Sequence, residues 1–154
     1  MDDLMAPIEL IDQDVIQGTI ETLHQTLTEM DESGLKVARL RAEELEAKRE
    51  EALFKNSLDE VENGAAMEAY GSAKCDGKNQ AMRDMQLKAY LAEHKGVVGS
   101  RNELTGAQAR LDAIGGEIAI AEHSYKIAAA RYYAARAELD AHTVLVKLTG
   151  GEEL

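Results

Sequence analysis

The stretch that decides the fold runs from residue 100 to residue 146 and reads SRNELTGAQARLDAIGGEIAIAEHSYKIAAARYYAARAELDAHTVLV. Apolar residues recur in it every seven positions, at Leu104, Leu111, Ile118, Tyr125, Tyr132, Leu139 and Val146. Three residues after the first six of them stand Ala107, Ile114, Ala121, Ala128, Ala135 and His142. This alternation of three and four residues is typical of a coiled coil. It predicts one helix of about 45 residues, on the order of 65 Å long, that opens at the capping box formed by Ser100 and Glu103.

A helix of that length cannot bury itself in a 154-residue chain and needs a partner. Residues 35–70 supply one, because they are rich in strong helix formers and carry an apolar residue every seven positions at Leu40, Ala47, Phe54 and Val61. Alanine at alternate core positions lets two helix axes approach closely. Gly115 and Gly116 allow a still closer approach or a bend.

The segment between the two long helices predicts a turn and a shorter helix. Residues 71–77 read GSAKCDG, a loop composition near the middle of the chain. Asn79 is a suitable N-cap for a helix that ends near His94 and Lys95, before Gly96. Aromatic residues make up only 4% of the chain, and proline occurs once. We therefore expect an all-α fold, an elongated antiparallel helical hairpin or coiled coil with a long C-terminal helix.

The N-terminal part of the chain carries a separate apolar stripe on a predicted helix over residues 15–31, which Asp14 can cap. The stripe is made of Ile16, Ile20, Leu23, Leu27 and Met30. Ser33 and Gly34 predict a break or kink after it. We expect residues 1–34 to form an N-terminal arm and self-association helix, residues 35–154 to form the hairpin domain, and the protein to be a homo-oligomer, with a dimer favoured.

Charge is distributed unevenly along the chain, whose 17 basic and 29 acidic residues give a net charge of −12. Residues 1–73 carry −12 and residues 74–136 carry +3. An acidic surface attracts the basic groove of a nucleic-acid enzyme, whereas a basic segment contacts phosphates. The candidate acidic contacts are Glu43, Glu44, Glu46, Glu50, Glu51, Asp59, Glu60 and Glu62. The candidate nucleic-acid contacts are Lys78, Arg83, Lys88, Lys126, Arg131 and Arg136.

Catalytic and cofactor signatures are weak. The segment 71–79 resembles a P-loop only briefly, since five residues separate its glycines and Asn79 follows Lys78 where a Ser or Thr is needed. The four histidines form no HxxxH or HExxH pair, and Cys75 has no evident base. We expect no catalytic residues, no cofactor and no metal. A single cysteine, no signal sequence and no long apolar run lead us to expect a cytoplasmic protein without a membrane partner.

The stretch from about Glu62 to Leu111 resembles small coiled-coil proteins of tailed phages, often encoded near recombination or anti-defence genes. The likeness rests on the Gly77-Lys78-Asn79 turn, on Arg83 four residues further on, and on the long heptad helix that follows. It covers about a third of the chain. The resemblance implies a helical, non-enzymatic phage or prophage protein acting near DNA.

From the resemblance and the charge we expect a non-catalytic phage-type protein that binds and inhibits a host or defence nucleic-acid enzyme, such as a nuclease or CRISPR effector. The acidic helix surface would then act in part as a DNA mimic. One alternative is a DNA-binding accessory protein of phage recombination that uses the basic residues. Another is a coiled-coil scaffold or chaperone with no link to nucleic acid.

Overall fold

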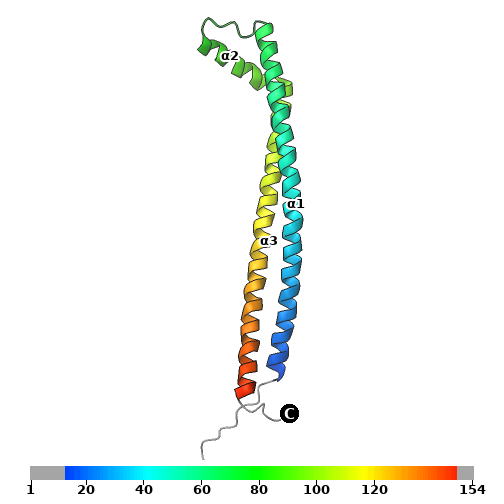
Figure 1. Cartoon of the computed structure of the whole chain (residues 1–154). Coiled ribbons are helices and arrows are strands. Elements are labelled where there is room, and N and C mark those ends of the chain that lie inside the picture. Colours follow the sequence, from blue (N-terminus) through cyan, green and yellow to red (C-terminus); the bar gives the residue numbers. More distant parts are fainter. Residues whose placement is uncertain (1–12, 149–154) are drawn as a thin grey trace, which may run out of the picture. The chain divides into compact units, whose positions relative to one another are not determined.

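A computed structural model describes residues 13–148 and contains three helices, with no strand among those residues. The helices are α1 (Gln13–Gly71), α2 (Gln80–Glu93) and α3 (Lys95–Leu148), as Figure 1 shows. The prediction of an all-α, hairpin-like fold is confirmed. None of the helices in the described part is long and apolar enough to cross a membrane. Residues 1–12 of the expected N-terminal arm lie outside the described residues.

The chain folds as two compact units, which we name unit 1 and unit 2. Within the described range, unit 1 contains residues 13–39 of α1 and residues 118–148 of α3, and unit 2 contains residues 40–117. In unit 1 the N-terminal part of α1 packs with the last part of α3, and the boundary expected after residue 34 stays a prediction.

In unit 1 the two helix segments run antiparallel, and one ion pair sets their register. Arg131 Nη1 donates to Glu29 Oε2 at 2.9 Å. One row of mostly buried or half-buried residues alternates by three and four positions along α1, and a second row does so along α3, where Tyr125 is 40% exposed. We call these two rows the inner stripes. The inner stripe of α1 here is Ile16, Thr19, Leu23, Thr26, Met30, Ser33 and Val37, and that of α3 is Ile118, Ala121, Tyr125, Ala128, Tyr132, Ala135, Leu139 and His142.

The inner stripes of unit 1 combine small residues with large ones. Each stripe alternates small and large residues, with Thr26 between Leu23 and Met30 on α1 and Ala128 between Tyr125 and Tyr132 on α3. Thr26 has no exposed surface, and its hydroxyl donates to the carbonyl oxygen of Thr22 at 2.8 Å. The hydroxyl of Thr19 donates to the carbonyl oxygen of Val15 at 3.0 Å in the same way. A buried threonine is therefore satisfied by its own helix, which removes the main cost of a polar group at a core position.

Unit 2 has a more apolar core and two ion pairs between its helices. Its buried residues include Leu40, Ala47, Ala65, Ala69, Val97, Ala107 and Ile114, and Val97 has no exposed surface. Arg110 Nη1 donates to Glu50 Oε2 at 2.8 Å. Arg101 donates to Glu62 Oε1 through Nε at 3.0 Å and Nη2 at 2.7 Å. These pairs fix α1 antiparallel to α3 within this unit.

Helix α1 ends in a Schellman motif, which uses alanine where glycine is usual. The N–H of Lys74 donates to the carbonyl of Ala69 at 3.0 Å, and the N–H of Ala73 donates to the carbonyl of Tyr70 at 3.4 Å. Ala73 adopts the left-handed conformation, with a φ of 55°, that this motif requires at that position. The predicted loop over residues 71–77 is thus confirmed, with a defined geometry at its start.

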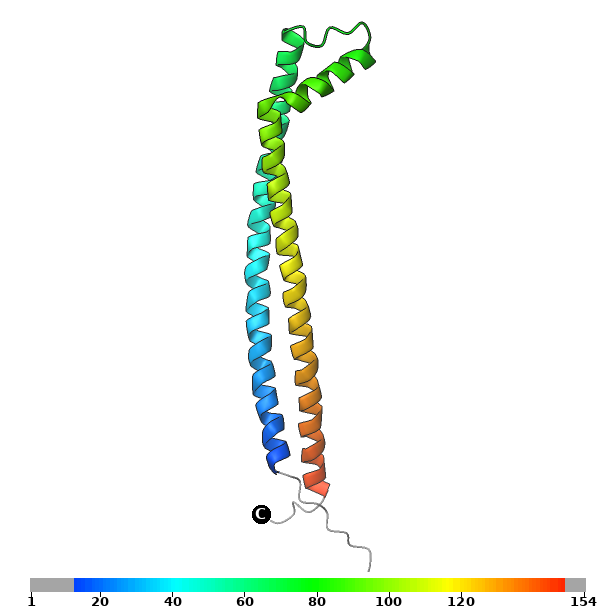
Figure 2. The same cartoon turned by 180° about the vertical axis from the view of Figure 1, so that it is seen from behind.

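The start of α2 confirms the predicted N-cap. The side-chain oxygen of Asn79 accepts a hydrogen bond from the N–H of Met82 at 2.9 Å. The N–H of Gly77 donates to Gln86 at 2.9 Å, and a Cβ at Gly77 would lie 2.8 Å from the Cβ of Met82. The loop therefore folds back so closely on α2 that only glycine fits. In Figure 2, α2 runs at an angle to the α1 and α3 segments of its unit.

The side chain of Tyr90 ties α2 to the end of α1. Its hydroxyl donates to Glu68 at 2.8 Å, and Lys74 Nζ lies 4.7 Å from the centre of its ring. The hydrogen bond to the Glu68 carboxylate raises the pKa of the Tyr90 phenol. His94 packs at 5.6 Å from the same ring and caps α2.

Two local predictions were wrong, and of the two alternatives at Gly115 and Gly116 the closer approach is not observed. Helix α1 continues through Ser33 and Gly34 instead of breaking there. Helix α3 begins at Lys95 and includes Gly96, so the box that opens at Ser100 lies inside a helix and caps nothing. A Cβ placed on Gly115 or Gly116 would meet nothing within 4 Å, so neither glycine serves close packing.

Candidate functional site: the acidic surface of α1

The eight acidic candidates all lie on α1 within unit 2, and the structure divides them into two groups of four. Each member of the first group accepts a hydrogen bond or forms an ion pair inside the unit. These are Glu44, Glu50, Glu51 and Glu62. Members of the second group are exposed and have no ion-pair or hydrogen-bond partner among residues 13–148. These are Glu43, Glu46, Asp59 and Glu60.

Glu44 shows why the first group is structural. Its carboxylate accepts from Lys48 Nζ at 2.8 Å and from Arg41 Nη1 at 3.0 Å, and its side chain is only 17% exposed. The hydrogen bond from Lys48, followed by that from Arg41, lowers the pKa of the Glu44 carboxyl because both cations favour its charged form. Glu51 accepts from Gln108 on α3 at 3.3 Å. Glu44 is therefore engaged within α1, and Glu51 is engaged between α1 and α3.

The four exposed carboxylates form the candidate site. They lie on one helix, and the outermost two, Glu43 and Glu60, are separated by about 25 Å along its axis at 1.5 Å per residue. A rigid helix therefore presents fixed negative charges to solvent over that length. Such an array can bind lysine and arginine side chains of another macromolecule, since exposed carboxylates are free to accept charge-assisted hydrogen bonds.

The six basic candidates are divided equally between the two units. Three of them, Lys78, Arg83 and Lys88, lie exposed in unit 2 near α2. The other three belong to unit 1, where Arg131 is paired with Glu29, and Arg136 Nε donates to Asp140 at 3.3 Å. The hydrogen bond to Asp140 raises the pKa of Arg136. Partners inside unit 1 therefore already neutralise two of the six cations.

The apolar stripe predicted for self-association is only partly available. Ile16, Leu23 and Met30 belong to the inner stripe of α1 in unit 1 and are half-buried. Ile20 is also half-buried, and Leu27 is 42% exposed. The inner stripe of α1 contains Thr19 and Thr26, whereas the predicted stripe contained Ile20 and Leu27. Sequence reasoning missed both threonines, because only their bonds to the backbone make them suitable for burial.

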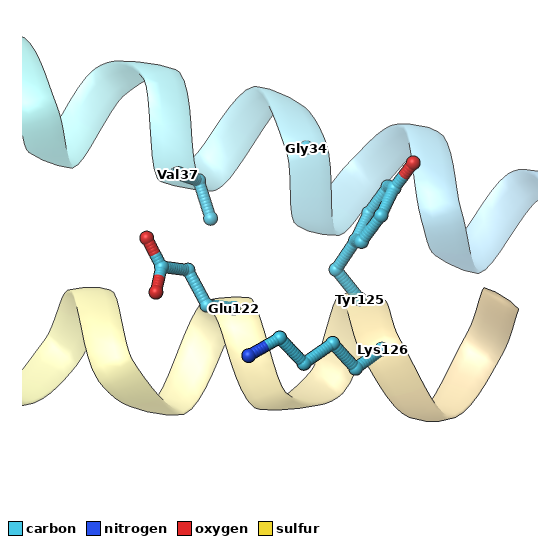
Figure 3. Close-up of a pocket in the computed structure, with 5 residues that line it drawn as sticks. All are labelled: Gly34, Val37, Glu122, Tyr125 and Lys126. Carbon is cyan, nitrogen blue, oxygen red and sulfur yellow. The ribbon is translucent and has the colours of Figure 1, made fainter. Parts of the chain in front are cut away.

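Unit 1 also contains a small pocket that the sequence did not reveal. It has a volume of about 260 Å³ and is lined by Gly34, Val37, Glu122, Tyr125 and Lys126. Figure 3 shows Tyr125 of α3 reaching toward α1 beside Gly34, whose missing side chain leaves the space open. The pocket lacks a nucleophile paired with a base. A glycine inside a helix next to a core position was the only signal for it.

The remaining chemistry-bearing residues show no catalytic arrangement. Cys75 is a free thiol and is buried at the tip of unit 2. His142 Nδ1 is buried without a hydrogen-bond partner, and its Nε2 lies 3.9 Å from Glu138. Within the described part of the chain, no group of three or more His, Cys, Asp or Glu side chains could hold a metal ion.

Comparison with models of protein families, with curated proteins and with solved structures found no significant match for this chain.

Proposed function

We propose that this chain is a non-catalytic, phage-type protein that binds and inhibits a nucleic-acid enzyme of the host or of its defence, partly through the acidic surface of α1. The observation that carries the proposal is the group of exposed carboxylates Glu43, Glu46, Asp59 and Glu60, which have no partner within residues 13–148. In a chain with a net charge of −12, they provide a fixed negative surface for a basic groove.

The experiment compares two fourfold charge reversals. The test variant changes Glu43, Glu46, Asp59 and Glu60 to Lys. The control variant changes Asp31, Glu32, Glu93 and Glu117 to Lys, which are also exposed and without a described partner. Both variants change the net charge by the same amount, so a difference between them reports position and not total charge. Glu44, Glu50, Glu51 and Glu62 are left intact because their reversal would break contacts inside unit 2.

The tagged wild-type chain is first used to capture partners from a bacterial lysate, with and without nuclease treatment. We expect a nuclease-resistant partner that is itself a DNA or RNA enzyme, whose activity the wild-type chain and the control variant inhibit. The test variant should lose inhibition, and high salt should weaken the wild-type complex. Full inhibition by the test variant would end the proposal.

The alternative of a DNA-binding accessory protein rests on Lys78, Arg83 and Lys88, which remain exposed. It predicts capture that disappears with nuclease and single-strand binding that falls steeply with salt. Changing these three residues to Gln would then abolish binding, whereas inhibition of an enzyme by the acidic surface would be unaffected.

A further inference from the structure

Helix α3 carries a second row of residues in unit 1 that faces solvent and contains no Asp, Glu, Lys or Arg. We call this row the outer stripe of α3. It follows the same alternation of three and four positions as the inner stripe and consists of Ile120, His123, Ile127, Ala130, Ala134, Ala137, Ala141 and Val144. All eight residues are exposed, including the large side chains of Ile120 at 66%, Ile127 at 49% and Val144 at 55%. Unpartnered apolar surface of this extent marks an interaction site.

The matching row of α1 in the same unit has a different composition. Its outward residues are Asp14, Gly18, Glu21, Gln25, Thr28, Glu32, Leu35 and Arg39, all of them exposed. Four are charged and two more are polar, as expected for a helix face in contact with water. The lack of charge is therefore particular to α3 and does not reflect the composition of the unit.

We propose that the outer stripe of α3 binds the same stripe of a second copy of this chain, with the two α3 helices antiparallel. The inference does not depend on the proposed function. In a two-fold arrangement the stripe is complementary to itself. Ala130 meets Ala134 of the second copy at the centre, Ile127 meets Ala137, and Ile120 meets Val144. The alanines at the centre let the helices approach closely, as they do in the inner stripes.

Charges beside the stripe favour this register. It places Lys126 next to Asp140 of the second copy, and the two-fold axis repeats the pair. Asp140 also accepts from Arg136 of its own helix, which leaves its second oxygen available. A shift by one heptad would place Lys126 against Tyr133 or Lys147, and a parallel arrangement would place it near Arg131. Like charges at flanking positions of a coiled coil are unfavourable, and among these three arrangements only the proposed antiparallel register places Lys126 beside an acidic residue.

In the proposed dimer, Arg131 lies near Arg131 of the second copy, on the side of the two-fold axis opposite Lys126. Its guanidinium is already bonded to Glu29 at 2.9 Å within unit 1, so the two arginines meet as neutralised pairs. Tyr133, which is 67% exposed and packs edge-on against Tyr132 at 5.6 Å, lies beside the axis on the Lys126 flank. Exposed aromatic side chains of this kind are enriched at protein interfaces.

The first experiment measures the mass of the full chain in solution by analytical ultracentrifugation. We expect twice the 16.8 kDa of one chain for the wild type. Ile127→Glu should reduce the mass to that of one chain, because it buries an unpaired charge at the interface. The matched control is Leu35→Glu, a residue 71% exposed on α1 in the same unit, which should leave the dimer intact. Circular dichroism should show the same helix content for all three proteins.

The second experiment tests the register by oxidation in a Cys75→Ala background. Two single variants, Ala130→Cys and Ala134→Cys, are oxidised separately and as a mixture. We expect covalent dimers only in the mixture, because residue 130 meets residue 134 of the second copy within disulfide reach. Lys126→Asp and Asp140→Lys should each weaken the dimer, and the double exchange should restore it.

Several results would overturn the proposal. A wild-type chain that remains a monomer at high concentration excludes the dimer. A dimer that survives Ile127→Glu as well as Leu35→Glu uses another surface. Covalent dimers from Ala130→Cys alone indicate parallel helices and exclude the antiparallel register.

Discussion

The two units of the molecule use the same helical spacing but fill their inner stripes with different side chains. In unit 2, Leu40, Val97 and Ile114 are buried, and ion pairs flank the core. In unit 1, the buried residues of α1 are Thr19 and Thr26, which face alternating alanines and large residues on α3. The difference teaches that a heptad repeat specifies where helices touch but leaves open how the contact is stabilised.

The physical balance in the two units should differ accordingly. An apolar core is stabilised mainly by the area it removes from water, so losing a large side chain is its most harmful change. A stripe built from small residues depends on close fit, so adding volume is more harmful there than removing it. The predictions below test this contrast, beginning with the largest expected effect.

Ile114→Ala in unit 2 should lower the free energy of unfolding by about 2 to 5 kcal/mol, because it leaves a cavity beside α1. In unit 1, Ala128→Leu should lower it by about 1 to 3 kcal/mol, because Ala128 is only 3% exposed and the added carbons must fit between the two helices. Urea denaturation at one fixed protein concentration measures both changes.

A control separates packing from helix propensity in this comparison. Ala38→Leu introduces the same side chain on an exposed position of α1 in unit 1 and should change the stability little. If Ala128→Leu proves as harmless as Ala38→Leu, the alanines of α3 are not closely packed and the contrast between the units fails.

Glycines inside the helices offer a gain in stability. Gly115→Ala and Gly116→Ala should each raise the free energy of unfolding by about 0.5 to 1 kcal/mol, because a Cβ at either position meets nothing within 4 Å. Gly77→Ala should instead lower the free energy of unfolding, because the new Cβ would lie 2.8 Å from the Cβ of Met82 and 3.0 Å from the backbone N of Arg83. Thermal unfolding should rise for the first two variants and fall for the third.

The smallest expected effect concerns the pH dependence of unit 2. The lowered pKa of Glu44 means that its charged form stabilises the folded state above its ordinary value of 4.5. This contribution should disappear as the pH falls through the lowered pKa. Glu44→Gln should therefore have a lower urea midpoint than the wild type near neutral pH and the same midpoint in strong acid. A difference that persists in acid would assign the effect to packing and not to charge.

Much of the fold could be predicted from the sequence because it depends on long-range periodicity. The spacing from Leu104 to Leu139 gave the inner stripe of α3, and Ala107, Ile114, Ile118 and Ala128 are indeed buried. The loop and the Asn79 cap depend on local chemistry and were also confirmed. The agreement is weaker at Tyr125, in the middle of the predicted row, and at Val146, at its end, since they are 40% and 45% exposed.

The partner of the N-terminal stripe could not be predicted from the sequence. Ile20 and Leu27 appeared to belong to it because they are apolar, whereas the inner stripe passes through Thr19 and Thr26. A threonine can be buried only when a carbonyl one turn earlier accepts its hydroxyl, and that choice is made in the folded helix. The division of the acidic candidates was equally hidden, because Arg101 and Arg110 reach Glu62 and Glu50 from a distant part of the chain.

The antiparallel pairing in unit 1 has a mechanical consequence. Helix α1 begins at Gln13 and helix α3 ends at Leu148, and both ends belong to unit 1. A force that separates these ends would peel the helices apart one turn at a time instead of shearing every contact at once. Peeling would start at this end of unit 1, which also holds His142, whose buried Nδ1 has no hydrogen-bond partner among the described residues. We therefore expect the two helices of unit 1 to separate at low force, beginning at the end that contains the unpaired His142 nitrogen.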